Sequence, residues 1–298
     1  MKKINNKNIQ YQNLLIRCVE GIHDTNLQQN VYDNIQNFKD RSTNYKNLAQ
    51  SQTLYQISPQ LKDNFTYKNM KFLYGKLRDS SHARAYYDKI MSASNICPYC
   101  GVQISSSLDH YLPKKHYPMY SIDPMNLLPC CSDCNTQKGE HQQLQGTETL
   151  HPYFDQFSNM RFLMMNVEEI DNNVAFEYYI EKPNDLSGQE YNKVVKHFEL
   201  LNLDKMYSIL ASSEVHSQIY NLKKLYDEGG QGAVQQNLKD IYLSNYHAEM
   251  NSWKTALYDG LRNSEWFCEK GIFIFEYISN ESEAIEEPIP IPNREGLV

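Results

Sequence analysis

The stretch that decides the fold reads Cys97-Pro-Tyr-Cys100-Gly101, Leu108-Asp109-His110, Asn126-Leu-Leu-Pro-Cys130-Cys131-Ser-Asp-Cys134-Asn135 and finally Lys138-Gly139. It holds two Cys-x-x-Cys pairs, Cys97 with Cys100 and Cys131 with Cys134. Such pairs present two thiolates at the angle that a tetrahedral zinc ion requires. We therefore expect these four cysteines to hold one structural zinc ion, with an acid, an imidazole and two amides close by.

The remaining cysteines do not suggest disulfide bonds. Cys130 offers an alternative register for the second pair, but Cys131 with Cys134 has the regular spacing, and we expect Cys130 to fill an apolar position. Cys18 and Cys268 stand alone in the sequence. This usage indicates metal binding in a reducing cytoplasm rather than a disulfide framework.

The composition is that of an ordinary globular protein. The chain has 298 residues, of which 41% are hydrophobic and 22% charged, so it can bury a large core. The run Leu14-Leu15-Ile16 is too short for a signal-peptide core, and no apolar run approaches membrane-spanning length. We therefore expect a cytoplasmic protein with no membrane partner.

Charge is distributed unevenly along the chain, whose net charge is −7. Residues 1–96 carry 14 Lys and Arg against 7 Asp and Glu, whereas residues 142–298 carry 12 against 25. Phosphate attraction depends on local charge, so the basic amino-terminal part can face a polyanion while the acidic part faces away. The alternative is that both parts are solvated surfaces, and the sequence leaves this open.

Hydrophobic periodicity predicts a mainly α protein with a small α+β core. Four segments follow from it: a helical, basic region at 1–96, the cysteine-rich core at 97–155, a β-hairpin with acidic helices at 156–280, and a disordered tail at 281–298.

Finer patterns mark individual elements. Asp171-Asn172-Asn173 forms the turn of the predicted hairpin, and Gly229-Gly230 breaks the helical run that follows. Apolar residues at helical spacing form one stripe over 191–201 and a second over 246–261. The stretch 68–89 interleaves basic and aromatic residues, which suits either a helix against nucleic acid or an amphipathic helix with a basic outer face.

Asp109 and His110 provide the reactive chemistry. An imidazole with a pKa near 6.5 suits a base that activates water at neutral pH. The adjacent carboxylate is a hard oxygen ligand for Mg²⁺ or Mn²⁺. Asn135 directly follows Cys134, so the zinc site fixes its side chain at the start of the next helix, where it can supply a second oxygen ligand.

This combination resembles the HNH endonuclease family, in which a β-hairpin and a helix grip one metal ion (ββα-metal fold), in its zinc-knuckle subgroup. The resemblance covers about 45 of the 298 residues. It rests on Cys97-Pro98-Tyr99-Cys100-Gly101, Leu108-Asp109-His110, Asn126-Leu127-x-Pro129 and Cys131-x-x-Cys134-Asn135-x-x-Lys138-Gly139. It implies a zinc-stapled ββα-metal motif inserted between helical flanks.

The resemblance also implies a role for each matching position. His110 matches the general base, Asp109 the metal-binding acid, and Asn126 the central asparagine that holds the loop and orients the base. Asn135 matches the third signature position, a metal ligand, where many members have His. That difference favours an all-oxygen site and hence Mg²⁺ or Mn²⁺.

Three lysines are candidates for binding nucleic acid. Lys138 lies one helical turn beyond Asn135, where it either contacts a phosphate or is a solvated helix lysine. Lys114 and Lys115 lie in the loop after His110, where they can flank the scissile phosphate. His116 competes with His110 for the role of base but lacks an adjacent acid. We expect His141 and His151, outside the motif, to be structural.

The resemblance implies a metal-dependent endonuclease that hydrolyses phosphodiester bonds in DNA, with RNA as a further possible substrate. The alternative is a non-catalytic, zinc-stabilised module that binds nucleic acid or protein. Such a module has no need of Asp109, His110, Asn126 and Asn135 together, and this favours the enzyme. The wording at 109–114 is also similar to the PtuB-like nucleases of bacterial anti-phage defence, which implies an ABC/SMC-type ATPase as partner. The acidic region 142–298 is then either a docking surface for that partner or a charge that repels DNA until activation. Restriction-type and mobile-element HNH enzymes remain alternatives.

Overall fold

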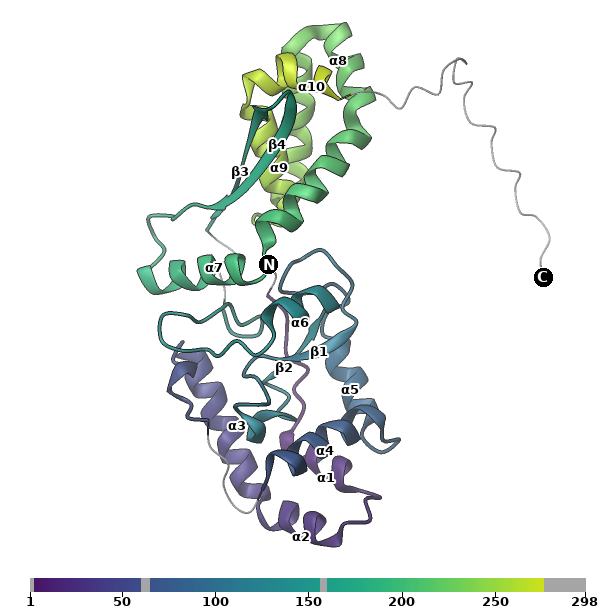
Figure 1. Ribbon diagram of the computed structural model, residues 1–298, viewed down its shortest axis with the longest axis vertical. Coiled ribbons are helices and arrows are strands. Elements are labelled where there is room, and N and C mark those ends of the chain that lie inside the picture. Colours follow the sequence, from purple (N-terminus) through teal and green to yellow (C-terminus); the bar gives the residue numbers. More distant parts are fainter. Residues whose placement is uncertain (1–2, 60–64, 156–159, 276–298) are drawn as a thin grey trace, which may run out of the picture.

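The structure is a computed structural model that describes residues 3–59, 65–155 and 160–275 (Figure 1). It is mainly helical with two small antiparallel sheets, so the predicted fold class is confirmed at that level. The tail predicted at 281–298 lies outside the described residues. Over the residues described, no helix is both long and apolar enough to cross a membrane.

The basic region folds into five helices and one short 3₁₀ turn among its described residues. The first helix buries the apolar stripe that begins at Tyr11, and Asp24 caps the second by accepting a hydrogen bond from the Leu27 amide. The elements are α1 (Tyr11–Val19), α2 (Thr25–Asp33), α3 (Ile35–Gln50), η1 (Leu54–Gln56), α4 (Tyr67–Asp79) and α5 (Arg84–Met91).

The cysteine-rich core is a hairpin followed by a helix. Strands β1 (Ser107–His110) and β2 (Leu127–Cys130) are antiparallel, and the register places His110 opposite Leu127. The loop between them contains the short turn η2 (Pro118–Tyr120). Helix α6 (Ser132–Lys138) follows directly, which completes a ββα unit.

Buried residues of helices α1–α5 and of the ββα unit belong to the same hydrophobic core. Helix α5 packs on both strands, and α4 packs on η2. Tyr45 of α3 donates a hydrogen bond to Asn126 and Ser42 donates one to Asp123, so the helices hold the loop that precedes β2. The site is therefore built on the whole of this lobe.

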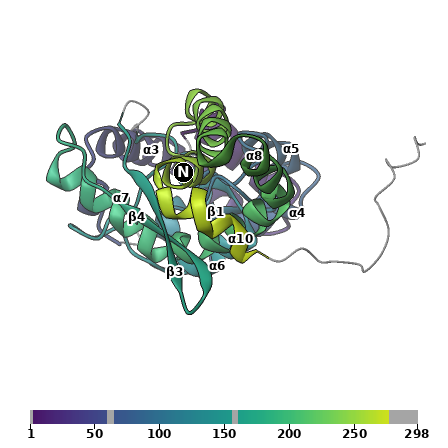
Figure 2. The same cartoon turned by 90° about the horizontal axis from the view of Figure 1, so that it is seen from above.

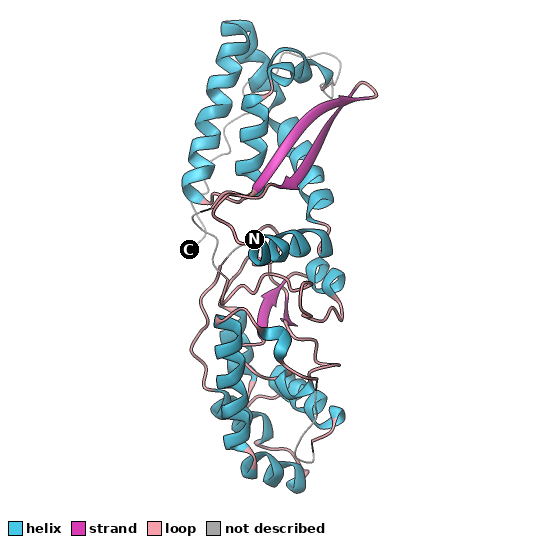
Figure 3. Cartoon of the chain, turned by 90° about the vertical axis from the view of Figure 1, so that its left-hand side faces the viewer, coloured by secondary structure: helices cyan, strands magenta, loops and turns pink. Residues whose placement is uncertain are grey.

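A second lobe contains a long hairpin packed on two helices (Figures 2 and 3). Its strands are β3 (Leu163–Ile170) and β4 (Asn173–Ile180), and Asp171 and Asn172 make the turn with φ of 51° and 60°. The predicted hairpin and its turn are therefore confirmed. The other elements are α7 (Gly188–Leu200), α8 (Leu203–Ala248), α9 (Trp253–Asn263), η3 (Phe267–Gly271) and α10 (Ile272–Ile274).

The predicted break at Gly229-Gly230 is confirmed, because Gly230 has φ 66° and ψ −164° and divides α8 into two arms (Figure 1). The second apolar stripe, over 246–261, is divided between α8 and α9. The chain leaves helical geometry at Glu249, and Ser252 starts α9 by accepting a hydrogen bond from the Thr255 amide. The apolar spacing runs through both helices, so it does not show where the first helix ends. The local cap at Ser252 decides where the second helix begins.

Candidate functional site

The four cysteines of the two pairs converge on one point. All four are buried, and the sulfur atoms of Cys97, Cys100, Cys131 and Cys134 lie within 4.8 Å of one another. Zinc–sulfur bonds of about 2.3 Å place tetrahedral thiolates roughly 3.8 Å apart, so this cluster fits a zinc ion with small adjustment. The Cys131 sulfur also accepts a hydrogen bond from the Cys134 amide and so caps α6. The helix therefore begins at the cysteine cluster.

Cys130 lies beside this cluster but outside it. Its sulfur is 4.0 Å from the Cys97 sulfur and 3.3 Å from the Cys131 carbonyl oxygen, to which it donates. Its position on β2 is fully buried. The geometry therefore supports the Cys131 and Cys134 register, with Cys130 as a packing residue. All seven cysteines lie in the described part of the chain, and none of them is in a disulfide.

His110 ends β1 with one ring nitrogen already engaged. Its Nε2 lies 2.9 Å from the carbonyl oxygen of Ser121. Because a carbonyl can only accept, Nε2 carries the proton and Nδ1 keeps its lone pair. Burial, reinforced by the Lys114 ammonium, lowers the pKa of His110 to about 3. The pKa near 6.5 expected from the sequence is therefore wrong for this buried ring, which is neutral at pH 7 and a weaker base than a free imidazole, with Nδ1 as its basic atom.

Asp109 lies inside a network of donors. Its Oδ2 accepts a 2.7 Å hydrogen bond from the Tyr99 hydroxyl, and Lys138 Nζ lies 3.0 Å from the same oxygen. Lys138 also donates to the His110 carbonyl oxygen at 2.6 Å. The sequence suggested a surface position for Lys138; the structure instead buries it, because the last turn of α6 faces β1. Its ammonium is unavailable to a phosphate.

Asn126 forms hydrogen bonds that hold the loop between β1 and β2. It is fully buried; its Nδ2 donates to the carbonyl oxygens of Leu112 and Tyr120, each at 3.0 Å. Its Oδ1 accepts from the Leu112 amide at 2.7 Å and from the Tyr45 hydroxyl at 3.2 Å. His151 contacts the same hydroxyl at 3.0 Å. Four bonds from one side chain hold the loop that carries Ser121, the partner of His110.

Asn135 lies on the face of α6 that carries Lys138, three residues later. Its Nδ2 donates to the Ser107 hydroxyl at 3.3 Å. Ser107 and Asp109 are two residues apart on β1 and share one face of the strand. The structure therefore brings Asn135 and Asp109 to the same side of the hairpin. Both offer hard oxygens suited to Mg²⁺, although the Lys138 ammonium competes for the carboxylate.

The loop after His110 places its basic residues differently. Lys115 is exposed and forms a 2.6 Å ion pair with Glu140. His116, with 31% of its side chain exposed, lies 3.9 Å from the same carboxylate. Lys114 is half-buried, with its ammonium 4.7 Å from the centre of the Tyr74 ring. Among these residues, Lys114 is the one that reaches toward His110.

Several contributors to the site were missed from the sequence. His197 of α7 contacts the Tyr99 carbonyl oxygen at 2.9 Å, and Tyr207 of α8 donates to the Cys100 carbonyl oxygen at 2.8 Å. These two side chains connect the second lobe to the first cysteine pair by hydrogen bonds. Lys193 of α7 forms a buried ion pair with Asp155 at 2.7 Å. Polar residues on the buried stripe of α7 were the available signal.

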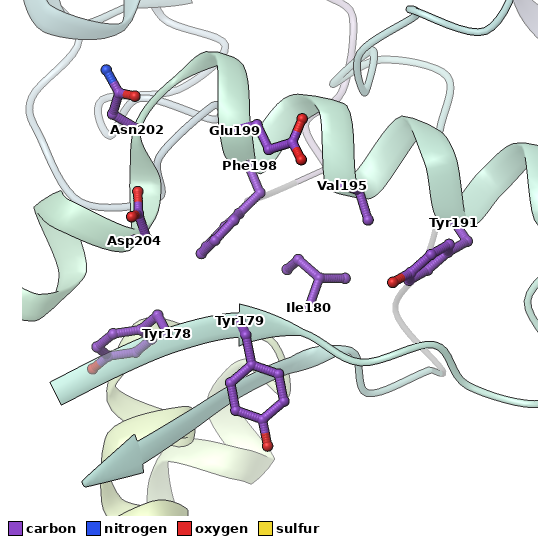
Figure 4. A pocket seen from close by; sticks show the side chains of 9 residues that line it. All are labelled: Tyr178, Tyr179, Ile180, Tyr191, Val195, Phe198, Glu199, Asn202 and Asp204. Atoms are coloured by element: carbon purple, nitrogen blue, oxygen red, sulfur yellow. The ribbon is translucent and has the colours of Figure 1, made fainter. Parts of the chain in front are cut away.

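An open cavity of about 420 Å³ lies between β4 and α7 (Figure 4). Tyr179, Tyr191 and Phe198 line it, and the carboxylates of Glu199 and Asp204 lie at its edge. None of the lining residues belongs to the site around His110. The two carboxylates make this cavity unfavourable for a phosphate.

The fold and site thus define a ββα unit with a four-cysteine cluster suited to zinc, carried on helices. The chain is 28% identical over 294 residues to protein ea31 of Escherichia phage lambda, covering 90% of this chain and 99% of that protein. It is 33% identical over 72 residues to Septu protein PtuB of Bacillus thuringiensis, covering 22% of this chain and 28% of that protein. No protein-family profile and no solved structure matches the chain.

Proposed function

We propose that the protein is a metal-dependent endonuclease of the HNH type that hydrolyses phosphodiester bonds in DNA. The observation that carries this proposal is the fixed tautomer of His110, whose Nε2 is bound to the Ser121 carbonyl oxygen while Nδ1 keeps its lone pair. The partial similarity to PtuB and the four-cysteine cluster support it. A structural zinc module needs no buried, oriented base of this kind.

In this proposal, His110 Nδ1 accepts a proton from the water that attacks phosphorus. The bond between phosphorus and the 3′ oxygen breaks as the new bond forms, and the 3′ oxygen leaves and takes up a proton from solvent. Asp109 and Asn135 would hold one Mg²⁺ or Mn²⁺, which supplies charge neutralisation at the phosphate when bound. Asn126 keeps Ser121, and through it the His110 ring, in position. The zinc cluster holds α6 so that Asn135 faces the strand that carries Asp109.

A cleavage assay tests the activity. The zinc-loaded protein is incubated with supercoiled plasmid, single-stranded DNA and RNA in the presence of Mg²⁺, Mn²⁺ or no divalent cation. We expect cleavage of DNA that requires added cation, is absent in His110→Ala and persists in His116→Ala. Asn135→Ala should raise the Mg²⁺ concentration needed for half-maximal rate. Failure to cut any substrate, or equal cutting by His110→Ala, would contradict the proposal.

The similarity to PtuB also supports a role in anti-phage defence. We propose that the protein acts in the cytoplasm with an ABC/SMC-type ATPase, for which the acidic segment 142–298 offers a docking surface. Affinity purification from cells that express the native operon should recover such an ATPase in fixed stoichiometry. A monodisperse protein that cuts DNA at full rate by itself would count against this role.

A further inference from the structure

Helix α4 lies directly against His110. The ring of Tyr74 packs edge-on against the imidazole, with ring centres 4.5 Å apart, and its hydroxyl donates to the Leu108 carbonyl oxygen at 3.4 Å. The Lys114 ammonium sits 4.7 Å from the centre of the same tyrosine ring. Tyr74 therefore contacts both the candidate base and the Lys114 ammonium.

That outer face is cationic. Lys71 and Arg78 precede and follow Tyr74 by three and four residues, so one turn of helix places them on the same side of α4. Both are exposed. They are also close enough to Lys114 that, after burial, their charges are the next causes that lower its pKa. The three cations thus repel one another close to the Tyr74 ring, which contacts His110.

We infer that Lys71, Arg78 and Lys114 bind the phosphodiester backbone of a nucleic acid and lead it to His110. This inference deepens the proposed nuclease function and rests on it. A bound phosphate relieves the mutual repulsion of the three cations, and the surrounding segment, 1–96, has seven more basic than acidic residues.

The anions near this surface leave it free to bind a phosphate. Asp79 pairs with Arg78 at 2.8 Å, but both side chains are more than half exposed. Exposed pairs of this kind contribute about 0–1 kcal/mol and exchange readily for another anion. The Asp109 carboxylate is buried and already paired with Lys138. The acidic cavity beside α7 lies on another part of the molecule (Figure 1).

Binding is measured in the His110→Ala background, so that cleavage does not interfere. Fluorescence anisotropy follows two duplexes of unrelated sequence, a single-stranded DNA and an RNA duplex over a series of salt concentrations. Lys71→Ala, Arg78→Ala and Lys114→Ala are compared with Lys224→Ala, which removes an exposed charge on α8 in the other lobe. Thermal unfolding confirms that each variant is folded.

Each of the three substitutions should weaken binding equally for both duplexes and reduce the slope of log K against log salt by about 1. Lys224→Ala should change neither. The inference is overturned if the three variants bind like the parent, if the loss is confined to one sequence, or if the parent binds none of the nucleic acids. Comparison of the DNA and RNA arms identifies the preferred backbone. This experiment measures binding and not cleavage. A failure of the nuclease proposal would appear in the cleavage assay instead, so the two failures can be told apart.

Discussion

Lys138 and Asp109 form an ion pair inside the protein, with Nζ 3.0 Å from Oδ2 and side-chain exposures of 2% and 4%. The lysine ends α6 and the aspartate lies on β1, so the pair joins the helix that starts at the cysteine cluster to the strand that ends at His110. The same ammonium donates to the His110 backbone. The cysteine cluster and the candidate base are therefore mechanically connected through one side chain.

Lys138→Met should destabilise the protein by about 3–5 kcal/mol, because it leaves the Asp109 carboxylate buried without a counter-ion. Urea unfolding measures the change. Adding Asp109→Leu should recover much of the loss, since no charge then remains unpaired. Lys115→Met is the matched control: it breaks an exposed pair and should cost less than about 1 kcal/mol. Equal effects of the two lysine substitutions would show that the Lys138 pair is not buried in solution.

The zinc content of two variants distinguishes Cys134, which belongs to the cluster, from Cys130, which lies beside it. Cys134→Ser removes a sulfur from the cluster and should lower bound zinc from one equivalent toward zero, with loss of folded protein, because binding of structural zinc contributes on the order of 10 kcal/mol. Cys130→Ser, which changes a sulfur outside the cluster, should retain one zinc. Metal analysis of the purified variants gives the answer. Full zinc in Cys134→Ser, or its loss in Cys130→Ser, would reverse the assignment of the second pair.

Stability should fall when the pH drops below 6.5. Burial lowers the pKa of His110 to about 3, that of His197 to about 4, and that of His151 well below its usual value. Their contribution is complete above pH 6.5 and is lost as the pH falls, since the unfolded chain then binds more protons. Asp123 acts oppositely: burial raises its pKa to about 7, so its contribution is complete below pH 3.8 and is lost as the pH rises.

The three histidines outnumber Asp123, so near pH 5 the unfolded chain binds more protons than the folded protein, and the free energy of unfolding should fall as the pH decreases. Urea unfolding between pH 5 and pH 6 measures this slope. Asp123→Asn removes the opposing group and should therefore make this slope steeper. A slope near zero in the parent would mean that these histidines are accessible to protons in the folded state.

Several features of the fold could be predicted from sequence, because their determinants are local. The spacing within each Cys-x-x-Cys pair, the Asp171-Asn172 turn and the break at Gly230 each depend on a few neighbouring residues. His110 lies at the end of β1, and Asn126 bonds the loop between the strands; their roles as base and orienting residue stay predictions.

The burial of Lys138 could not be predicted in this way, because it depends on a strand 28 or more residues distant and on the packing of α6. The same holds for His197 and Tyr207, which reach the first cysteine pair from the second lobe. Polar side chains on an apolar stripe indicate only that some long-range partner exists. Which residues these partners are is decided by tertiary packing.

The most direct test of the account is the single-turnover rate of DNA cleavage by His110→Ala at saturating protein. We predict a fall of at least about 10²-fold, the typical contribution of a general base, with zinc content and thermal stability within the range of the parent protein. A rate within threefold of the parent, in a variant that still binds zinc and DNA, would contradict the assignment of His110 as the base.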